Sequence, residues 1–585
     1  MHVIATAGHV DHGKSALVRA LTGMEPDRLT EERRRGLTID LGFGWTTLAS
    51  GTRLAFVDVP GHERFVPTML AGLGPVPAVM LVVAADEGWM PQSAEHLSAL
   101  DAFGVRHGLL VVTRSDLADP APARAEARSK LRGTSLERMP CVEVSSVTGQ
   151  GVDSLRAALE DLARQLPVPD TTAAVRLWVD RSFTVRGSGT VVTGTLAAGR
   201  IAVGDELELA SSGRRVRVRA LQTLTEQATT VRSVARVAVN LRGVDRREIG
   251  RGDALLTPGR FLRSDVLDVR LDGEDPDDLP QSAMLHIGSA ATAVRLRPIG
   301  AGAVRLQLAR ELPLWIGDRA LLRDPGRRRV LGGVTVLDPQ PPPLSRRGAA
   351  AARAIELKDV TAEPDLTGEL RRRKLVQRSH LIAMGVPVPA RPVAGDWLAD
   401  PEHWEAVRGR LGEVVEKYAR AHPLETGAPV ELVRRRLGLP ERSLVTALLR
   451  PPLVLRDGRV VRGEDGIVLP ARVVAALEIL RAELRTAPFA APDADRLRDL
   501  GLGPREISAA SRAGQLLRVT SGLVLLPGAD QQALAVLADL PEPFTLSEAR
   551  LALATTRRVA VPLLEMLERR GATERLADGR HRLRR

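Results

Sequence analysis

An octapeptide close to the amino terminus constrains the fold of this chain more than any other feature. Residues 8–15, GHVDHGKS, place two glycines around four residues and then add Lys14 and Ser15. The apolar run Val3–Ala7 precedes the octapeptide, and the helical pattern Ser15–Leu21 follows it. A glycine-rich loop between a strand and a helix presents backbone N–H groups and a helix N-terminus to phosphate groups. The octapeptide therefore predicts a nucleotide-binding α/β domain.

The first 168 residues continue this pattern. Further apolar runs alternate with amphipathic stretches, and these runs are Leu54–Val57, Val79–Ala84, Leu109–Val112 and Cys141–Val144. Short apolar runs separated by helical segments predict a mostly parallel sheet with helices on both faces. Because Pro167-Val168-Pro169 interrupts the pattern, we expect this P-loop domain to span residues 1–168.

Two later segments supply the other groups that a nucleoside triphosphate and Mg²⁺ require. In the first, Arg35–Asp40, Thr38 lies where a switch segment closes over the γ-phosphate. In the second, Asp58 and Gly61 follow an apolar strand, so that the carboxylate can hold Mg²⁺ and the Gly61 N–H can approach the γ-phosphate. Lys14 is expected to reach the β- and γ-phosphates. The predicted Mg²⁺ ligands are Ser15, Thr38 and Asp58.

The segment Thr113–Asp116, TRSD, follows another apolar run and predicts the choice of base. GTPases carry Asn-Lys-x-Asp at this place, where the last carboxylate pairs with guanine N1 and N2. Asp116 is retained, whereas Thr113 and Arg114 depart from the pattern, although the Arg114 stem can still stack on the base. Ser145-Ser146 takes the place of the second guanine-contact loop. The predicted GTP-binding residues are Gly8, Asp11, His12, Gly13, Lys14, Ser15, Thr38, Asp58, Gly61, Thr113, Arg114, Asp116, Ser145 and Ser146.

Residues 170–340 change to an alternation of period two, as in Glu206–Leu209 and Val304–Leu308, with dense glycines between the runs. This pattern predicts antiparallel sheets or small barrels, and the length fits two of them, 170–256 and 257–340. The proline-rich segment Asp338–Pro343 predicts a stiff linker.

Residues 344–585 are helical and contain a crude internal repeat. Helix, short turn, helix and a hairpin with a glycine-bearing tip recur in 425–470, 471–530 and 531–585. This order predicts winged-helix domains, and 344–424 is expected to hold a degenerate further copy. Generic α-helical packing is the alternative. The predicted fold class is therefore multidomain: an α/β P-loop GTPase domain, two β-barrel domains and a C-terminal array of winged helices.

Composition narrows the class of protein. The net charge of +12 indicates either a polyanionic partner such as RNA or only an arginine-rich composition, so the location of the charge must decide. The single cysteine, Cys141, excludes an intrachain disulfide and a cysteine-rich zinc site. No run of about 18 apolar residues is free of charge, and the early P-loop leaves no room for a signal peptide. We therefore expect a soluble, monomeric cytoplasmic protein without a membrane partner.

The motifs resemble those of a known family. At residues 8–15, 35–40 and 58–65 the chain is similar to the translational GTPases, elongation factor Tu among them. Asp180–Leu196, DRSFTVRGSGTVVTGTL, and Val237–Asp253 are similar to the second domain of that family, and most of all to its selenocysteine-specific elongation factors. The winged helices have no counterpart in elongation factor Tu. The resemblance implies a GTPase that binds selenocysteinyl-tRNA, a selenoprotein mRNA hairpin and the ribosome, and delivers the tRNA at a recoded UGA codon.

The resemblance also implies roles for single residues. His62, directly after Gly61, would position the attacking water, and an ordinary exposed switch histidine is the alternative. Asp11 would help to hold a monovalent cation, and an ordinary surface carboxylate is the alternative. Asp180, Arg181 and Arg236 match positions that line the family's selenocysteinyl pocket, where a selenolate attracts two guanidinium groups and Asp180 takes the α-amino group. A solvated barrel rim is the alternative for the two arginines.

The last winged unit is the predicted site for the mRNA hairpin. Pro541–Arg585 contains ten arginines against six acidic residues. Arg557 and Arg558 begin the helix that is predicted to be the recognition helix, while Arg580 and Arg582 lie on the predicted wing, so the two groups bracket a surface for an RNA backbone. A solvated arginine-rich end is the alternative.

Two other classes of protein remain open. The first is another GTPase of this branch. An initiation-factor subunit or a sulfate-activation GTPase lacks four C-terminal winged units, so the winged region decides against these two, whereas another translational-type GTPase with a nucleic-acid-binding winged-helix tail remains the alternative. The second is a DNA-binding regulator with a nucleotide switch. The signature in Asp180–Leu196 argues against that reading.

Overall fold

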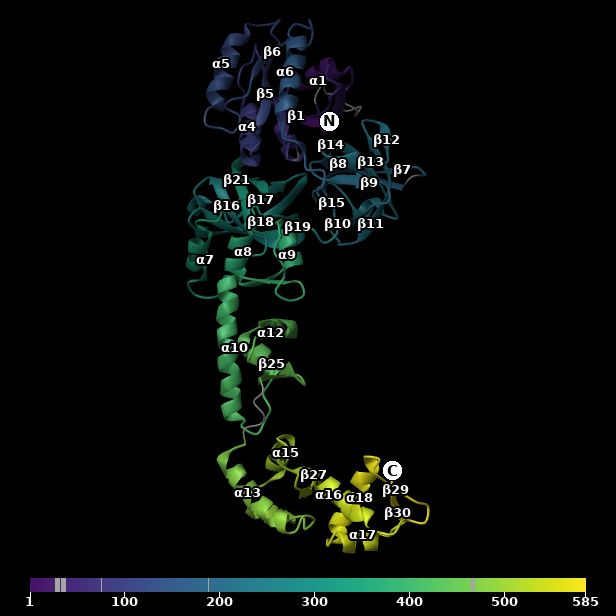
Figure 1. The fold of residues 1–585 in the computed structure, drawn as a ribbon. Coiled ribbons are helices and arrows are strands. Elements are labelled where there is room, and N and C mark those ends of the chain that lie inside the picture. The colour runs from purple at the N-terminus through teal and green to yellow at the C-terminus, as the bar shows by residue number, and fades with distance from the viewer. Residues whose placement is uncertain (27–31, 33–37, 75, 188, 464–468, 585) are drawn as a thin grey trace. The chain divides into compact units, whose positions relative to one another are not determined.

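The computed structural model describes residues 1–26, 32, 38–74, 76–187, 189–463 and 469–584 (Figure 1). Residues 35–37 of the predicted switch segment lie outside these ranges. The chain forms two compact units, Met1–Ala390 and Arg391–Arg585. Within the described ranges, no helix combines the length and the apolar character that crossing a membrane would need.

A six-stranded sheet forms the centre of the amino-terminal domain, in the order β2-β3-β1-β4-β5-β6. Its strands are β1 (His2–Ala7), β2 (Gly42–Thr47), β3 (Arg53–Asp58), β4 (Ala78–Ala84), β5 (His107–Thr113) and β6 (Cys141–Glu143). All neighbouring strands are parallel except β2 and β3. The predicted parallel sheet is confirmed, but β2 was not predicted, because its GFGWTT sequence interrupts the apolar residues with glycine.

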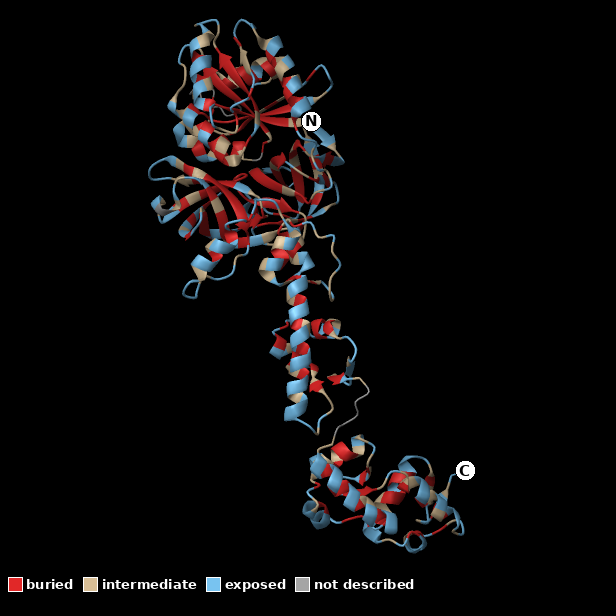
Figure 2. Cartoon of the chain, turned by 60° about the vertical axis from the view of Figure 1, so that its left-hand side comes forward, coloured by how far each residue is buried: buried red, intermediate tan, exposed pale blue. Residues whose placement is uncertain are grey.

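Helices cover both faces of this sheet. They are α1 (Lys14–Thr22), α3 (Val66–Leu73), α4 (Pro91–Phe103), α5 (Pro120–Leu131) and α6 (Val152–Gln165), with the 3₁₀-helix η1 (Glu63–Phe65) before α3. Val3 and Ala5 of β1 join the core under α3, α4 and α5, while Ile4 joins the core under α1 and α6. Both cores are visible as buried interior (Figure 2). Because alternate residues of β1 are buried on opposite faces, the strand is apolar throughout.

The next segment forms the first barrel, β7 to β15. Its elements are β7 (Arg176–Val185), β8 (Gly189–Leu196), β9 (Arg200–Ala202), β10 (Glu206–Leu209), β11 (Arg215–Thr223), β12 (Glu226–Ala228), β13 (Thr230–Arg232), β14 (Ala235–Arg242), η2 (Arg246–Glu248) and β15 (Ala254–Leu256). The order β10-β15-β7-β8-β14-β11 closes on itself through the pairing of β10 with β11. The short strands β9 and β13 form a separate two-stranded ladder.

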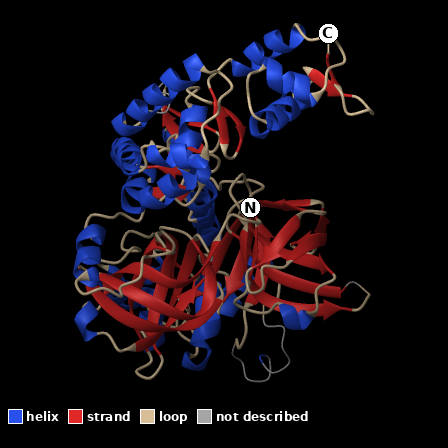
Figure 3. Cartoon of the chain, turned by 90° about the horizontal axis from the view of Figure 1, so that it is seen from below, coloured by secondary structure: helices blue, strands red, loops and turns tan. Residues whose placement is uncertain are grey.

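A second closed barrel follows, in the order β16-β19-β18-β17-β20-β21. Its elements are β16 (Leu262–Gly273), η3 (Pro276–Asp278), β17 (Ser282–Ile287), β18 (Ala290–Gly300), β19 (Ala303–Leu314), β20 (Arg319–Asp324) and β21 (Arg329–Asp338). Both predicted barrels are therefore confirmed. The strands of the two barrels are seen from below in Figure 3.

The first unit continues beyond the second barrel into α7 (Ala349–Leu357), α8 (Leu366–Arg373), β22 (Leu375–Gln377) and α9 (Arg378–Ala383). A buried ion cluster ties these helices to the barrel. Arg353 of α7 pairs with Asp268 at 2.7 Å and with Asp338 at 2.6 Å, and Arg373 of α8 pairs with the same Asp338. The first winged helix was predicted to span residues 344–424. These residues fall in both units, because their first helices pack on the barrel.

The second unit contains the predicted repeat of helix, turn, helix and hairpin. It begins with β23 (Trp397–Ala399) and the long helix α10 (Pro401–Ala421). The repeat elements are β24 (Ala428–Pro429), α11 (Val430–Leu437), α12 (Arg442–Leu448), β25 (Leu453–Arg456) and β26 (Arg459–Arg462); then α13 (Ala471–Thr486), α14 (Ala494–Asp499), α15 (Pro504–Arg512), β27 (Leu517–Thr520) and β28 (Leu523–Leu525); then α16 (Ala529–Ala538), α17 (Leu546–Ala552), α18 (Arg557–Arg569), β29 (Thr573–Arg575) and β30 (His581–Leu583).

The last two of these repeats share one hydrophobic core. Leu477 and Leu480 of α13 belong to the same buried cluster as Leu563 and Leu564 of α18. The Arg558 side chain also donates a hydrogen bond of 2.6 Å to the carbonyl of Ala491. Residues 471–584 therefore pack as one body in which neither repeat has a separate core.

Candidate functional site: a nucleotide pocket, a barrel pocket and a winged helix

The glycine-rich loop joins β1 to α1 in a conformation that needs glycine. Gly13, the N-cap of α1, is left-handed at φ 82°. Gly8 has φ 133°, and a Cβ atom there would collide with the carbonyl oxygen of Val82 on β4. The Gly8 N–H donates to Nδ1 of the buried His96 on α4 at 2.9 Å. His96 was missed in the sequence because it lies 88 positions away from the loop that it holds.

Lys14 is buried at the start of α1, and its Nζ donates to the carbonyl of His9 at 2.6 Å. A Cβ atom at Gly61 would lie 2.5 Å from that Nζ and 2.6 Å from the Val10 backbone nitrogen. Only glycine therefore lets the segment after β3 approach the phosphate loop so closely. Gly61 thereby lines the same cavity as Lys14.

The three predicted Mg²⁺ ligands converge. The Ser15 hydroxyl lies 3.0 Å from the Thr38 hydroxyl and donates to the Asp58 carboxylate at 2.6 Å. The second oxygen of Asp58 accepts from Thr6 at 2.6 Å, which fixes the carboxylate. Burial raises the pKa of Asp58, while its hydrogen bonds from Ser15 and Thr6 oppose the rise. Two hydroxyls and a carboxylate are the hard oxygen donors that suit Mg²⁺, so these residues fit that ion.

The base loop is tied to the phosphate loop. The buried Thr113 hydroxyl donates to the His12 carbonyl at 2.8 Å. Arg114 donates to the Asp11 carbonyl and pairs with Asp86 at 2.9 Å and Glu87 at 2.8 Å. The two departures from the usual motif thus make contacts that join the two loops, and Asp86 and Glu87 were not foreseen.

Together these segments line a cavity of about 410 Å³. Of the predicted GTP-binding residues, it is lined by Asp11, Gly13, Lys14, Ser15, Thr38, Gly61, Thr113, Arg114, Asp116 and Ser146. Asp116 is exposed and makes no hydrogen bond or ion pair with the described part of the chain. Ser145 instead closes its own loop, because its hydroxyl accepts from the N–H of Val147 at 3.3 Å and of Thr148 at 3.1 Å.

The histidines of the site differ in their surroundings. Burial lowers the pKa of His12 to about 4 and that of His96 to about 3, so both are neutral near pH 7. His62 caps η1, and its Nδ1 accepts from the N–H of Arg64 at 3.2 Å. That contact leaves Nε2 as the ring nitrogen available to a water molecule. His62 is not among the residues that line the cavity, so the ring must turn to reach it.

The predicted selenocysteinyl residues meet at the border between the amino-terminal domain and the first barrel. Arg236 of β14 forms a two-pronged ion pair with the buried Asp180 of β7, which also accepts from Thr193 at 2.6 Å. Arg181 pairs with Asp40 at 3.1 Å and donates to the Leu41 carbonyl. Both guanidinium groups therefore have protein partners in this structure.

Phe43 on β2 brings the two arginines together. The guanidinium carbons of Arg181 and Arg236 lie 5.1 and 4.1 Å from the centre of its ring. Because β2 was not predicted, Phe43 was missed in the sequence. A cavity of about 630 Å³ beside this cluster is lined by Asp40, Asp180, Arg181, Phe183, Arg246 and Arg251 among others.

Asp40 links this cluster to the nucleotide site, since it lies two residues after Thr38. Arg251 contacts both domains, donating to the Asp180 carbonyl at 2.9 Å and pairing with Asp40. Burial would raise the pKa of Asp40, but Arg181 and Arg251 outweigh it and hold this pKa below its ordinary value. The Asp40 carboxylate thus stays ionised between two arginines of the barrel.

In the last winged unit, the four arginines predicted to bind the mRNA hairpin differ in whether they have protein partners. Arg580 pairs with Asp578 at 2.7 Å, Arg582 pairs with Glu574, and Arg558 is used in the packing of the last two repeats. Arg557, at the start of α18, is exposed and has no hydrogen-bond or ion-pair partner among the residues the structure describes. One of the four predicted arginines is therefore unengaged.

Comparison with known protein families gives matches in four parts of the chain. The family model described as Elongation factor Tu GTP binding domain matches residues 1–165, and Elongation factor Tu domain 2 matches 189–256. The model for the Selenocysteine-specific elongation factor, beta-barrel domain, matches 264–343. The model for Elongation factor SelB, winged helix, matches 535–582.

Relatives that match over most or all of the chain belong to the same family as these models. The chain is 30% identical to the selenocysteine-specific elongation factor of Desulfomicrobium baculatum over 99% of both chains. It is 34% identical to that of Escherichia coli over 76% of this chain and 75% of the relative. A crystal structure of a bacterial selenocysteine-specific elongation factor superimposes with a TM-score of 0.76 at 26% identity and covers 100% of both chains. The protein is thus a GTP-binding, GTP-hydrolysing translation factor with a winged-helix end, and it belongs to the family of selenocysteine-specific elongation factors.

Proposed function

We propose that the protein binds GTP with Mg²⁺, carries selenocysteinyl-tRNA, and delivers it to the ribosome at a recoded UGA codon marked by an mRNA hairpin. The observation that carries the tRNA part has two linked parts. The Thr38 hydroxyl contacts the Ser15 hydroxyl, and Asp40, two residues after Thr38, pairs with Arg181 and Arg251. A switch segment that closes over the γ-phosphate would thereby fix the barrel arginines beside the aminoacyl cavity. Its proposed ribosomal partner places the activity in the cytoplasm.

For hydrolysis we assign separate tasks to the residues of the nucleotide pocket. Lys14 and the loop N–H groups hold the phosphates, and Ser15, Thr38 and Asp58 would hold Mg²⁺, which neutralises charge on the β- and γ-phosphate oxygens. Asp116 takes the guanine base. His62 positions the attacking water once its ring turns toward Gly61. This turn is a step that the ribosome would promote.

For the aminoacyl group we propose a site between Arg181, Arg236 and Phe43. A selenolate carries negative charge at neutral pH, so it competes with Asp40 and Asp180 for the two guanidinium groups, whereas a serine hydroxyl does not. Because Asp180 is already engaged by Arg236, the α-amino group would share that carboxylate rather than find it free. Selectivity would then rest on charge and not on volume alone.

For the mRNA hairpin we propose the last winged unit, with Arg557 as the principal contact and Arg558, Arg580 and Arg582 as subsidiary ones. Arg557 begins α18, where the helix N-terminus adds a partial positive charge toward phosphate. The second winged unit is the competing location, since its Arg442 is also exposed at the start of a helix.

The test of the delivery function is protection of the aminoacyl ester. Selenocysteinyl-tRNA and seryl-tRNA on the same tRNA are incubated with the full protein and GTP or GDP, and ester hydrolysis is followed. We expect GTP-dependent protection of the selenocysteinyl ester only. Equal protection of both esters, or equal protection with GDP, would contradict the proposal. The Asp40→Asn variant should retain GTP binding but lose much of the difference between GTP and GDP, because it weakens the link to Arg181 and Arg251.

A further inference from the structure

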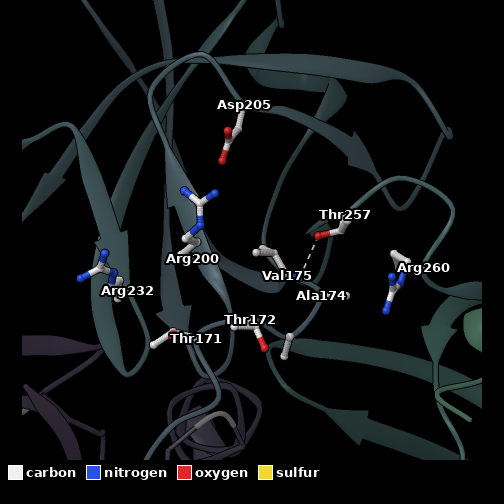
Figure 4. Close-up of a pocket in the computed structure, with 10 residues that line it drawn as sticks. Thr171, Thr172, Ala174, Val175, Arg200, Asp205, Arg232, Thr257 and Arg260 are labelled. Carbon is white, nitrogen blue, oxygen red and sulfur yellow. Dashed lines mark hydrogen bonds between the residues drawn. The ribbon is translucent and has the colours of Figure 1, made fainter. Parts of the chain in front are cut away.

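A cavity of about 750 Å³ lies away from both sites above, where the first barrel meets the segments that lead into it and out of it (Figure 4). It is lined by Thr171, Thr172, Ala173, Ala174 and Val175 before β7, by Arg200, Asp205 and Arg232 of the barrel, and by Thr257 and Arg260 after β15. In the view of Figure 4, Arg200 and Arg232 lie on one side of Thr172 and Arg260 lies on the other.

Arg200 and Arg232 face each other in the ladder of β9 and β13. The register pairs Arg200 with Arg232 and Ile201 with Val231. Ile201 and Val231 are buried in the barrel core, so the alternation of side chains turns both arginines outward on the same side of the ladder. Like charges directly opposite each other destabilise a strand pair. The arrangement therefore works against folding unless a negative group lies between the two.

Within the described ranges no carboxylate pairs with either arginine, although Asp205 lines the same cavity. Arg200, Arg232 and Arg260 are exposed, and none of them has a hydrogen bond or ion pair from its side chain to any residue within the described ranges. Only some of the other exposed arginines of the same barrel have such partners within the described ranges, as Arg215 has in Glu206 at 2.9 Å. The one carboxylate in the lining, Asp205, accepts from the Ala202 N–H at 2.8 Å within its own turn.

The backbone around the three guanidinium groups is fixed. The Thr257 hydroxyl accepts from the Val175 N–H at 2.8 Å, which ties the incoming segment to the outgoing one. The Arg260 carbonyl accepts from Trp315 Nε1 of the second barrel at 2.9 Å. Three cationic groups are thus presented on a rigid frame around a cavity, with only their side chains free to move.

We propose that this cavity is a phosphate-binding site that takes backbone phosphates of an RNA. Guanidinium groups bind phosphate oxygens in two-pronged geometry, and two opposed arginines with a third across the cavity suit successive phosphates of one strand. The proposal rests on the proposed function, which supplies two RNA partners of the same chemistry, the tRNA and the ribosomal RNA.

The test compares three RNAs with the full-length protein, over a range of salt concentrations. They are selenocysteinyl-tRNA with GTP, ribosomes with GTP, and a short RNA duplex of arbitrary sequence. The variants are Arg200→Ala/Arg232→Ala, Arg260→Ala, and Arg232→Lys as the conservative change. The matched control is Arg215→Ala, which removes the same charge from the same barrel at a position where Glu206 already neutralises it.

We expect the double variant to weaken binding of at least one RNA by about tenfold or more and to flatten its salt dependence by about two units, or about one unit per lost contact. Arg260→Ala should show about half the change in slope, Arg232→Lys should keep most of the affinity, and Arg215→Ala should match the parent. A loss confined to the tRNA or to the ribosome names the source of the phosphates. The thermal midpoint of the double variant should stay level or rise, because an opposed like-charge pair has been removed.

If all three RNAs bind the double variant with the parent's affinity and salt slope, the phosphate site is wrong. A fall in the thermal midpoint of the double variant together with unchanged binding would assign the two arginines a structural role and also overturn the proposal. Failure of the proposed function gives a different result, because the parent protein would then show no preference for selenocysteinyl-tRNA. Binding of the short RNA duplex would still measure phosphate binding at the cavity.

Discussion

The nucleotide pocket and the last winged unit both depend on charged side chains, but the structure arranges those side chains in opposite ways. In the pocket, Lys14, Ser15 and Asp58 are fixed by buried contacts at the ends of strands and at a helix start. On the wing, Arg580 and Arg582 form ion pairs with the neighbouring Asp578 and Glu574. The comparison teaches that a motif bound to backbone geometry predicts where a group lies, whereas a count of arginines does not predict which of them are available.

The sharpest test of the pocket is His62→Ala. We expect ribosome-stimulated GTP hydrolysis to fall by about 10²–10⁴-fold, because a positioned catalytic group is lost. The affinity for GTP should stay near that of the parent, since His62 does not line the cavity. Single-turnover hydrolysis with ribosomes and a separate nucleotide titration measure the two quantities. His62→Gln serves as the matched control, and a parental rate for His62→Ala would remove this residue from the mechanism.

The next largest effect is expected at Arg236, and it is an effect on stability. Arg236→Ala leaves the buried Asp180 carboxylate without its ion-pair partner, so the free energy of unfolding should fall by about 3 kcal/mol. Arg181→Ala should cost much less, because Arg181 and its partner Asp40 are partly exposed. Urea denaturation of the full protein measures both.

A double variant separates folding from ligand binding at this site. Asp180→Asn combined with Arg236→Gln restores a neutral hydrogen-bonding pair and should recover most of the stability lost in Arg236→Ala. Its loss of selenocysteinyl-tRNA binding, measured against seryl-tRNA, would then report the ligand contact alone. If Arg236→Ala unfolds at the parental urea midpoint, the buried pair does not support the barrel.

The same comparison explains how much the sequence predicts. The parallel sheet, the two barrels and the repeat of helix, turn, helix and hairpin follow from periodicity and glycine positions. Ser15 and Asp58 meet because the parallel strands β1 and β3 end at one edge of the sheet, and Thr38 joins them because it lies just before the start of the antiparallel strand β2. Contacts over long sequence distances do not follow. His96 holds the phosphate loop, and Phe43 lies on a strand whose glycines hide its alternation. Both depend on packing that no local pattern encodes.

In the last winged unit we expect a smaller effect than in the pocket. Arg557→Ala should lower the affinity for the mRNA hairpin by about tenfold and flatten its salt slope by about one unit, because an unengaged cation is lost. Arg582→Ala should change the slope by less, since its charge is shared with Glu574. Filter binding over a range of salt concentrations measures both, with Arg442→Ala of the second winged unit as the control.

If Arg442→Ala is the variant that loses hairpin binding, the RNA site lies in the second winged unit. Point substitutions suit this test better than removal of residues 541–585, because Leu563 and Leu564 belong to the core that the last two repeats share. A truncation would expose that core and confuse loss of fold with loss of contact. For the same reason Arg558→Ala is a poor probe, since Arg558 bonds to the Ala491 carbonyl.

The smallest expected effect is on the pH dependence of stability, and it involves His96 beside the nucleotide pocket. Burial lowers the pKa of His96 from 6.5 to about 3. Below pH 6.5 the His96 ring is therefore protonated in the unfolded chain but stays neutral in the folded chain until the pH approaches 3. The stability that this histidine supports is complete above pH 6.5 and is lost progressively as the pH falls toward 3. At pH 5.5, one unit below 6.5, the free energy of unfolding should be lower by about 1.4 kcal/mol. His96→Gln should remove that part of the pH dependence. Gln can still accept from the Gly8 N–H, so GTP affinity should persist, whereas His96→Leu should weaken it. Denaturation midpoints between pH 5 and 8 decide the matter, and identical pH slopes for the parent and His96→Gln would show that His96 is not a neutral, buried acceptor.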